Sequence, residues 1–349
     1  MTGLRRLDVI CPVFREELGI ERFDTELWGV LDSLEGYQCH VLYVLDPYPG
    51  DGTQAQLETI CSRNPHASAL VLSRRFGHQA ALLAGLTHAP GDVVVMMDSD
   101  LQHPPETIRD LVAAFERGAD IVQAVRIDAP STGWLKRRTS HAFYAVMSRV
   151  ASVDMRGGSA DFRLFSRRVV DVFDSLPERN PFIRGLTSWV GFNVAHVEFT
   201  CRDREVGESK YTLRSLVEFA FTGITSFSKV PLRAAAVVGL AMSFLSLVYA
   251  VVAIASYFLS SYVAPGWAST SAVVSFVGGT QLLFLGLIAE YVGQIFDEVK
   301  ARPRYLVDRV LGEAPPVRAE ISDTTGATRM GHSRIVVSAN PDFPEEKIS

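Results

Sequence analysis

The sequence predicts an α/β protein with a mainly parallel sheet, followed by a two-helix hairpin that crosses a membrane. Two observations support this prediction. Strand-like and helix-like segments alternate with short loops through the first part of the chain, which is typical of parallel α/β sheets. Two long stretches that are almost free of charge follow, each long enough to cross a hydrocarbon core of about 30 Å. The 349 residues suffice for both parts.

The alternating part contains five short apolar runs that are bounded by turn residues. These strand-like segments are residues 7–14, 40–46, 68–73, 92–98 and 120–126. Helix-like segments lie between them, at about 16–34, 52–63, 78–88 and 105–117. The run at 92–98 is mostly Val and Met, as expected for a strand buried on both faces. Ligands bind beyond the carboxyl ends of the strands in such sheets, so polar residues at these ends are candidates for function.

Two carboxylates, Asp98 and Asp100, come at the end of this buried strand. Two like charges at this place are destabilising unless a cation, a basic side chain or solvent offsets them. No glycine-rich loop of the Walker or dinucleotide type follows any strand, so a metal ion would have to neutralise the phosphates of a bound nucleotide. The oxygen ligands of an Asp-x-Asp pair suit Mg²⁺ or Mn²⁺, although such a pair also occurs by chance in loops.

The stretches at about 234–258 and 271–292 predict membrane spans, with Glu290 as the only charge in either. The alternative is a pair of buried helices in a soluble protein, which rarely run so long without charge. Lys and Arg flank the outer ends of both stretches, whereas the loop between them has no charge. The positive-inside rule therefore predicts an integral protein of the cytoplasmic membrane, with both termini and the α/β domain in the cytoplasm.

Charge and cysteine spacing argue against some other classes of function. The formal net charge of −5 argues against nucleic acid as a partner. The cysteines lack metal-ligand spacing, so we expect reduced and mostly buried thiols; they are Cys11, Cys39, Cys61 and Cys201.

Eight motifs between about residues 5 and 310 together resemble a known family. They are VICPVFREE (9–17), RRFGHQAALLAGL (74–86), MDSDLQHPPE (97–106), ADFRLFSRRVVD (160–171), FIRGLTSWVGF (182–192), REVGESKYTLRSL (204–216), ITSFSKVPLR (224–233) and FLGLIAEYVGQIFDEVKARPRYLV (284–307). In this order they resemble the polyprenyl-phosphate glycosyltransferases of glycosyltransferase family 2, relatives of dolichyl-phosphate mannose synthase with two C-terminal membrane helices. The resemblance implies an A-type glycosyltransferase fold. It also implies inverting transfer of one sugar, with UDP-glucose as our first choice of donor, to polyprenyl phosphate.

The resemblance assigns a role to each matching position. Catalysis falls to Asp100 and Asp161. The metal ligands for Mg²⁺ or Mn²⁺ are Asp98, Asp100 and Gln102. The residues expected to bind the nucleotide sugar are Pro12, Glu16, Asp46, Asp98, Arg204 and Lys210. Those expected to bind the acceptor are Arg126, Arg137, Ser140 and Ser209.

Some of these assignments have structural alternatives. Glu16 could instead cap the next helix. Lys210 could be an ordinary interfacial lysine, and the segment WLKRRTSHAFY that contains Arg137 and Ser140 could be a solvated basic face. All three alternatives stay open from the sequence alone.

Asp161 calls for a chemical argument. The last pKa of a phosphate monoester is about 6, so near neutral pH little remains for a base to remove from the acceptor. We therefore expect Asp161 to orient the acceptor and the donor sugar, with proton abstraction as the lesser option. A carboxylate near a phosphate dianion needs a cation beside it, and we expect Arg163 or Lys210 in that place.

Two departures from the family pattern fall where the nucleoside is expected. After the second strand the family has two adjacent aspartates and then Gly-Ser-Thr-Asp-Gly-Thr, whereas this chain reads VLDPYPGDGT at 44–53. Leu45 replaces one aspartate, two prolines stiffen the loop, and one residue is added. Arg15 stands where the family has asparagine. These changes leave the base of the donor open.

The predicted organisation has four parts. They are a catalytic domain at 1–211, an amphipathic interfacial helix at 212–230, the membrane hairpin at 231–297 and a cytoplasmic segment at 298–349 that is disordered after about 313. The helix at 212–230 could instead pack under the catalytic domain. The expected partners are a nucleotide sugar, polyprenyl phosphate and the lipid bilayer, and a homo-oligomer is compatible with the sequence.

Two other functions compete with glycosyl transfer. A phosphatase with an aspartate nucleophile also uses Asp-x-Asp, but it needs the pair after the first strand and a Thr or Val two residues later. Here the pair follows the fourth strand, and Gln102 has that place. The second alternative is a membrane scaffold that has kept the fold and lost activity through the altered loop at 44–53.

Overall fold

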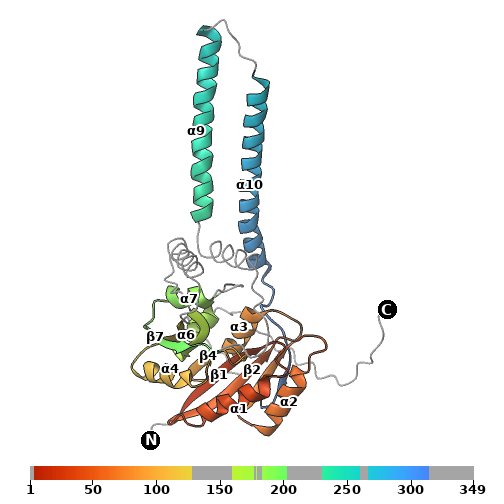
Figure 1. The fold of residues 1–349 in the computed structure, drawn as a ribbon, viewed down its shortest axis with the longest axis vertical. Coiled ribbons are helices and arrows are strands. Elements are labelled where there is room, and N and C mark those ends of the chain that lie inside the picture. The colour runs from red at the N-terminus through yellow and green to blue at the C-terminus, as the bar shows by residue number, and fades with distance from the viewer. Residues whose placement is uncertain are drawn as a thin grey trace, which may run out of the picture. The chain divides into compact units, whose positions relative to one another are not determined.

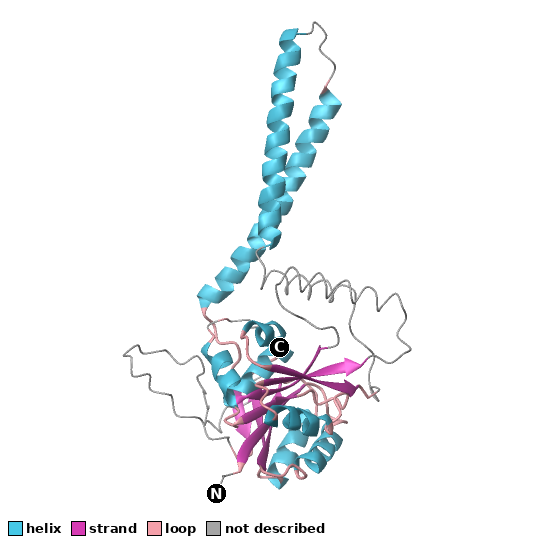
Figure 2. Ribbon diagram, turned by 90° about the vertical axis from the view of Figure 1, so that its left-hand side faces the viewer, coloured by secondary structure: helices cyan, strands magenta, loops and turns pink. Residues whose placement is uncertain are grey.

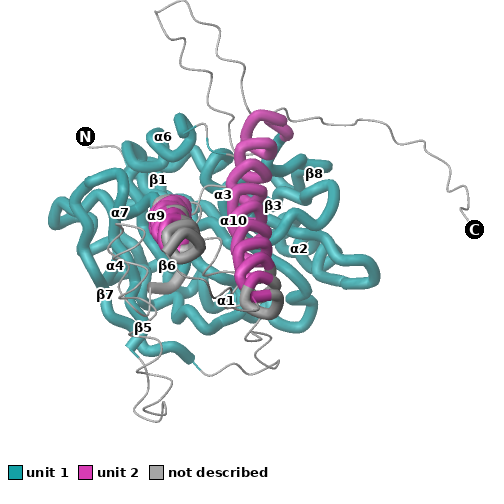
Figure 3. Tube along the Cα trace, turned by 90° about the horizontal axis from the view of Figure 1, so that it is seen from above, with its two compact units in different colours: residues 1–145, 153–210, 303–349 teal, residues 146–152, 211–302 magenta. Residues whose placement is uncertain are grey.

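The computed structural model describes residues 4–127, 159–176, 178, 183–202, 230–259 and 266–313. Within these residues the chain divides into two compact units, shown in Figure 3. The first contains 4–127, the described part of 159–202, and 303–313; the second contains 230–259 and 266–302. Several predicted features lie outside the described residues: Arg137, Ser140, Arg204, Ser209, Lys210, nearly all of the interfacial helix and the tail after 313.

The described part of the first unit is built on one eight-stranded sheet with the order β7-β5-β6-β4-β1-β2-β3-β8. Figure 1 shows this sheet with the helices beside it. The strands are β1 (Arg5–Val13), β2 (Tyr37–Leu45), β3 (Ala67–Leu72), β4 (Val93–Met96), β5 (Ile121–Ile127), β6 (Ser159–Ser166), β7 (Val194–Thr200) and β8 (Val307–Leu311). Neighbouring strands are parallel except where β6 meets β4 and β5, and where β8 meets β3. The prediction of a mainly parallel sheet is confirmed.

Helices cover both faces of this sheet. They are α1 (Ile20–Leu31), α2 (Thr53–Arg63), α3 (His78–His88), α4 (Thr107–Glu116), α6 (Arg167–Ser175) and α7 (Ile183–Trp189). Successive side chains of a strand point to opposite faces, so the central strands supply two cores. One core contains Val9 and Val95 with apolar residues of α1, α2 and α4; the other contains Ile10 and Met96 with those of α3, α6 and α7.

The sequence predicted the first four strand–helix repeats, with several boundaries off by two to four residues. The helix expected at 16–34 begins only at Ile20, because Arg15 has a left-handed backbone (φ 59°) and Gly19 is the N-cap. The expected thiols are confirmed, since all four cysteines are free and three of them are buried. Strands β6, β7 and β8 were not predicted. In β6 the polar Asp161 and Arg163 lie on a buried face, so its local pattern does not look like a core strand.

After the helical unit the chain returns to the first unit and adds β8 to the sheet. The Ser73 backbone N–H donates to the Leu306 carbonyl at 2.9 Å, and Val307 is buried in the core. The Arg304 guanidinium donates to the carbonyls of Leu176 and Glu178. Because β8 pairs with β3, the hydrogen-bonding edge of β3 is covered. The segment at 298–349 therefore contains a strand that sequence patterning did not reveal.

The described part of the second unit is a hairpin of two long helices, α9 (Val230–Leu259) and α10 (Trp267–Lys300), as Figures 1 and 2 show. Within α10 the stretch Phe276–Lys300 is long and apolar enough to cross a membrane, and α9 has a shorter apolar stretch at Ala235–Tyr249. Large apolar side chains such as Leu240 and Leu282 face outward on both helices. Such an exposed apolar surface is typical of helices that contact lipid or another protein.

Candidate active site

The candidate site lies at the carboxyl edge of the sheet, where the loops after β1 and β4 meet. Strand β1 lies between β4 and β2, so residues that follow these three strands come together. Two hydrogen bonds join strand β1 to the start of the loop after β4. The Met97 backbone N–H donates to the Ile10 carbonyl at 3.1 Å, and the Ser99 hydroxyl donates to the Pro12 carbonyl at 2.9 Å. Pro12 thus fixes the loop that carries the Asp-x-Asp pair.

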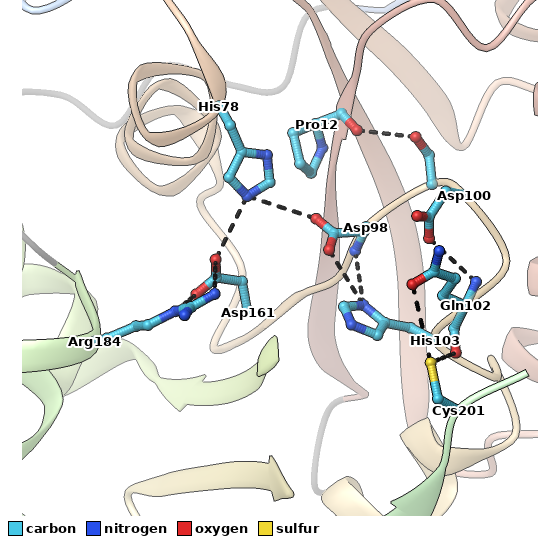
Figure 4. A network of polar contacts seen from close by, with 10 residues as sticks. Pro12, His78, Asp98, Asp100, Gln102, His103, Asp161, Arg184 and Cys201 are labelled. Atoms are coloured by element: carbon cyan, nitrogen blue, oxygen red, sulfur yellow. Dashed lines mark hydrogen bonds and ion pairs between the residues drawn. The ribbon is translucent and has the colours of Figure 1, made fainter. Parts of the chain in front are cut away.

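The Asp-x-Asp pair forms a tight turn (Figure 4). Asp100 Oδ1 accepts a hydrogen bond from the Gln102 backbone N–H at 3.1 Å, and Leu101 between them has a left-handed backbone (φ 60°). The Cys201 thiol, just after β7, donates to the Gln102 carbonyl at 3.3 Å. The turn therefore brings two carboxylates and one side-chain amide to the edge of the sheet. Strained non-glycine backbones of this kind cluster at functional sites.

Asp161 lies opposite Asp98 because of the strand register. Strand β6 is antiparallel to β4 and pairs Arg163 with Met96. Continuing that register by two residues places Asp161 opposite Asp98, on the same face of the sheet. His78, the first residue of α3, lies between the two carboxylates (Figure 4). Its Nε2 is 3.6 Å from Asp98 Oδ1 and 3.5 Å from Asp161 Oδ2.

Arg184 of α7 holds Asp161 from the other side. Its Nε and Nη2 donate to Asp161 Oδ1 and Oδ2 at 2.8 and 2.9 Å, which is a bidentate pair. Such a pair fixes the orientation of the carboxylate as well as its charge. We expected Arg163 or Lys210 in this place. In the described residues Arg184 makes the ion pair, and Arg163 acts on Asp161 through its charge. Lys210 lies outside the described residues, so the expectation is not tested for it.

The electrostatics of this group favour the carboxylate form of Asp161. Burial by itself would raise the pKa of Asp161, which is 5% exposed. Hydrogen bonds from His78 and Arg184, with the charges of Arg184 and Arg163, lower that pKa well below its usual range instead. Burial lowers the pKa of Arg163 to about 10, so its guanidinium stays charged at neutral pH. Asp161 is consequently an anion throughout the physiological pH range.

The surroundings of Asp98 have the opposite effect and raise the pKa of its carboxyl group. Burial raises the pKa of Asp98, and the negative charges of Asp161 and Asp100 act in the same direction, against His103 and His78. His103 is stacked on Phe162, and its Nδ1 accepts a hydrogen bond from the Asp98 backbone N–H at 3.1 Å. About a third of the Asp98 side chain stays exposed, so a ligand can reach it. A cation at this carboxylate would relieve the repulsion.

The side chains around the turn fit a hard divalent cation in part. Asp98, Asp100 and Gln102 offer oxygen atoms, which Mg²⁺ and Mn²⁺ prefer. Among the described residues, no group of three or more His, Cys, Asp and Glu side chains is arranged to hold a metal ion by itself. A cation at this turn would therefore need further oxygen ligands, and the diphosphate of a nucleotide could supply them.

Asp46, after β2, has a structural role in the described site. Its Oδ1 accepts from the Phe76 backbone N–H at 2.7 Å and its Oδ2 from the Gly77 N–H at 3.0 Å. These bonds hold the turn that leads into α3 and thus to His78. Gly77 has a φ of 96°, which only glycine adopts without strain. A contact between Asp46 and the nucleoside stays a prediction.

Two other residues that were predicted to bind a substrate, Glu16 and Arg126, also lie near the carboxyl edge of the sheet. The Glu16 backbone N–H donates to the Thr53 hydroxyl at 3.0 Å, which ties the loop after β1 to the start of α2. The Glu16 carbonyl accepts from the backbone N–H groups of Gly19 and Ile20 at 3.0 and 2.9 Å, at the start of α1. Arg126 is exposed near the carboxyl end of β5, and its predicted role in acceptor binding is not tested.

Sequence reasoning missed three side chains of this site: His78, His103 and Arg184. Each lies inside a motif that carried the family resemblance, but none had a pattern of its own to mark it. His78 is 83 residues from Asp161, and Arg184 is 23 residues away. A histidine at the first position of a helix that follows a glycine is the one local signal that could have singled out His78.

The fold and the site define a nucleotide-sugar transferase of the A-type glycosyltransferase fold. Residues 8–173 match the family described as glycosyl transferase family 2, and residues 230–295 match the GtrB C-terminal hairpin. The chain belongs to the polyprenyl-phosphate glycosyltransferases of glycosyltransferase family 2.

The chain matches several relatives over nearly the full length of those proteins. The SfII prophage-derived bactoprenol glucosyl transferase of Shigella flexneri is 36% identical over 304 residues, which are 87% of this chain and 98% of that protein. The prophage bactoprenol glucosyl transferase homolog of Escherichia coli strain K12 is 34% identical over 305 residues, 87% of this chain and 99% of that protein. Among solved structures, glucosyl-3-phosphoglycerate synthase from Mycobacterium tuberculosis, in complex with Mn²⁺, UDP and phosphoglyceric acid, is 18% identical. It has a TM-score of 0.47 and covers 63% of this chain and 76% of its own.

Proposed function

We propose that the protein transfers glucose from UDP-glucose to polyprenyl phosphate at the cytoplasmic face of the membrane, with inversion at the anomeric carbon. The names of relatives, bactoprenol glucosyl transferase, support both the sugar and the lipid acceptor. The product would be a polyprenyl-phosphate sugar for modification of the cell envelope.

The observation that carries this proposal is the anionic Asp161 opposite Asp98, with His78 between them. Asp161 accepts two hydrogen bonds from Arg184 and is held as a carboxylate, so it is a poor general base for the reaction. A rigid carboxylate can orient the hydroxyls of the donor sugar, because carboxylate oxygens accept hydrogen bonds. Orientation by fixed groups of this kind is a large part of catalysis of transfer between two bound substrates.

The chemistry itself needs no base once the acceptor is ionised. Near neutral pH the acceptor phosphate is mostly a dianion. One of its oxygens attacks the anomeric carbon from the face opposite the diphosphate. The new carbon–oxygen bond forms as the bond from the anomeric carbon to the diphosphate oxygen breaks. UDP leaves with the electron pair, and the configuration inverts.

Asp98, Asp100 and Gln102 are the residues that would hold Mg²⁺ or Mn²⁺. When bound, the cation would supply charge neutralisation for the diphosphate of the donor and of the leaving UDP. We assign the remaining contacts as follows. Nucleoside and diphosphate are bound by Pro12, Glu16, Asp46, Arg204 and Lys210. The lipid phosphate is bound by Arg126, Arg137, Ser140 and Ser209.

We also propose that α9 and α10 both cross the membrane. Their apolar outward faces and the match to the GtrB C-terminal hairpin support this topology. The basic residues at the outer ends of the two helices support an orientation with both ends of the hairpin in the cytoplasm. The segment at 212–230 would lie in the interface and keep the catalytic domain near the lipid headgroups.

One experiment tests the proposed reaction. Purified full-length protein is incubated with undecaprenyl phosphate and, in turn, UDP-glucose, UDP-N-acetylglucosamine and GDP-mannose, and the lipid is analysed by mass spectrometry. A hexose adduct only with UDP-glucose is expected. Transfer from another donor would replace glucose, and no transfer from any donor would favour the scaffold alternative.

The proposed metal site gives a prediction for metal removal and one for a substitution. EDTA should abolish the activity and Mg²⁺ or Mn²⁺ should restore it. Asp100→Asn should lower kcat by several orders of magnitude with an unchanged Tm, because it removes charge and not volume. The matched control is Asp110→Asn, at another acidic position, on helix α4. Full activity in chelator would exclude the metal role.

A further inference from the structure

The two departures from the family pattern contact each other. Arg15, in the family's asparagine position, has its guanidinium carbon 4.7 Å from the centre of the Tyr48 ring. Tyr48 belongs to the loop at 44–53, which carries the added residue and two prolines. Arg15 has a left-handed backbone (φ 59°), which is unfavourable for a residue with a side chain. The chain thus keeps a strained arginine where asparagine would be less strained.

Two further side chains support this pair. The Phe14 ring meets the Tyr48 ring edge-on, with centroids 5.8 Å apart and planes at 84°. The Arg75 guanidinium carbon lies 4.5 Å from the centre of the Phe14 ring. The four residues come from the loops after β1, β2 and β3. They contact one another in a row, with the two aromatic rings in the middle and an arginine at each end. We call them the Arg15–Tyr48 cluster.

The cluster lies beside the Asp-x-Asp turn. The end of β1 contacts the Asp-x-Asp turn through Pro12 and Ser99, and the loop after β1 contacts the start of α2 through Glu16 and Thr53. Strand β1 separates β4, which carries the carboxylates, from β2 and β3. A nucleotide whose diphosphate is held after β4 can therefore extend its nucleoside over the loops after β1 and β2. Tyr48 is 43% exposed, so part of its ring is open to a ligand.

We propose that Arg15, held over the Tyr48 ring, reads the base of the nucleotide donor and selects a base with a carbonyl oxygen at its edge, such as uracil. This inference rests on the proposed function and adds the source of its base specificity. A guanidinium has five N–H donors and no acceptor. It can therefore bind the O4 carbonyl of uracil but not the amino group that cytosine has at the same position. Tyr48 is then a positioning residue, because stacking fixes the plane of the guanidinium.

The test is nucleotide binding by the full-length protein in nanodiscs, measured by calorimetry with Mn²⁺ and either UDP, CDP or inorganic pyrophosphate. The parent should bind UDP more tightly than CDP. Arg15→Asn, which tolerates the left-handed backbone, should weaken UDP binding about tenfold or more and CDP binding little, so that the two affinities become similar. Tyr48→Ala should have the same effect, and the double variant should be no worse than the stronger single variant.

Two controls separate base reading from general damage. Pyrophosphate affinity should stay unchanged in both variants, because it lacks a base. Arg168→Asn removes another arginine–aromatic pair of this domain, in which the Arg168 guanidinium carbon is 4.5 Å from the Phe192 ring centre, and it should leave all three affinities unchanged. An unchanged ratio of UDP to CDP affinity in Arg15→Asn, or an equal loss of pyrophosphate binding, would overturn the proposal.

The outcomes also distinguish this proposal from the proposed function. A protein that transfers no sugar but loses its preference for UDP in Arg15→Asn would contradict only the function. An enzyme that uses UDP-glucose and keeps that preference in Arg15→Asn would contradict only the role of Arg15. A parent protein that binds no nucleoside diphosphate would overturn both.

Discussion

At the scale of single residues, Asp161 shows how surroundings decide chemistry. The sequence left orientation and proton abstraction as alternatives. In the structure, the Arg184 pair, His78 and the charge of Arg163 together keep the pKa of Asp161 low. Because a strong general base needs a pKa near the working pH, these contacts favour orientation.

Asp161→Asn tests this conclusion. The variant should lose much of its kcat, yet its residual rate should have the same pH dependence as the parent, since the acceptor dianion is still the nucleophile. A residual rate that climbs steeply with pH while the parent rate stays flat would show base catalysis instead.

The same variant should also lose stability, because it leaves two guanidinium groups without their carboxylate. Breaking a buried pair costs about 3–5 kcal/mol. Asp161 has a lowered pKa, so its stabilisation is present above the unfolded-state pKa of about 3.9 and is lost as the pH falls further. Asp161 also raises the pKa of His78, so the difference in stability should shrink as the pH rises through the pKa of His78 and be constant above it. Asp120→Asn, which breaks the more exposed pair with Arg168 (2.8 Å), is the control and should cost no more than about 1 kcal/mol.

Asp46 gives a second prediction at this scale. Asp46→Ala should raise the donor KM roughly ten- to a hundredfold through loss of a charged hydrogen bond to the nucleoside. The change should also lower Tm, because the backbone N–H groups of Phe76 and Gly77 lose their acceptor. Asp46→Asn keeps one acceptor and should recover part of Tm. An unchanged donor KM would place the nucleoside away from Asp46.

At the scale of elements, the position of helix α3 is important for the candidate site, because the helix begins with His78. Its close approach to β1 depends on Gly85, where a Cβ atom would lie 2.1 Å from Ile10 Cγ2. Ile10 is fully buried and cannot move aside without disturbing the core. The position of His78 between the two carboxylates is thus fixed partly from a point two helical turns away.

Gly85→Ala should therefore displace α3. We expect a loss of about 1–3 kcal/mol in stability, as for other overpacked cores, and a lower kcat through movement of His78. Gly29→Ala in α1 is the matched control, since no atom lies within 4 Å of its Cβ position. That variant should be stabilised by up to about 1 kcal/mol. Melting curves and kinetics on both variants check the prediction, and equal effects would contradict it.

At the scale of the whole molecule, the catalytic unit contains chain from both sides of the helical hairpin. Residues up to 202 and residues 303–313 belong to it, and β8 completes the sheet at β3. The hairpin is thus an insertion between parts of one domain and not a simple C-terminal anchor. A truncation before the hairpin would also remove the edge strand that covers β3.

Truncation tests this organisation. A chain that ends at residue 302 should have a lower Tm and aggregate more readily, because the edge of β3 is exposed and Val307 leaves the core. A chain that ends at 313 keeps every described contact of β8 and should melt like the parent. If the shorter chain were as stable and as soluble as the longer one, β8 would have no structural role.

The sequence by itself determined the features that local patterns encode. Alternating apolar runs predicted the first four strand–helix repeats, and uncharged stretches predicted the helical hairpin. The place of Asp98 and Asp100 followed from the rule that ligands bind at the carboxyl ends of parallel strands. These inferences succeed because hydrophobic periodicity and composition are properties of neighbouring residues.

Only the tertiary structure decided which distant side chains meet. Strand β6 buries Asp161 and Arg163 under α3 and α7, so its polar pattern hid a core strand from sequence reasoning. The choice of Arg184 as the partner of Asp161, and of Tyr48 as the partner of Arg15, depends on the packing of separate elements. Contacts of this kind join residues far apart in the chain, and no local period of hydrophobicity records them.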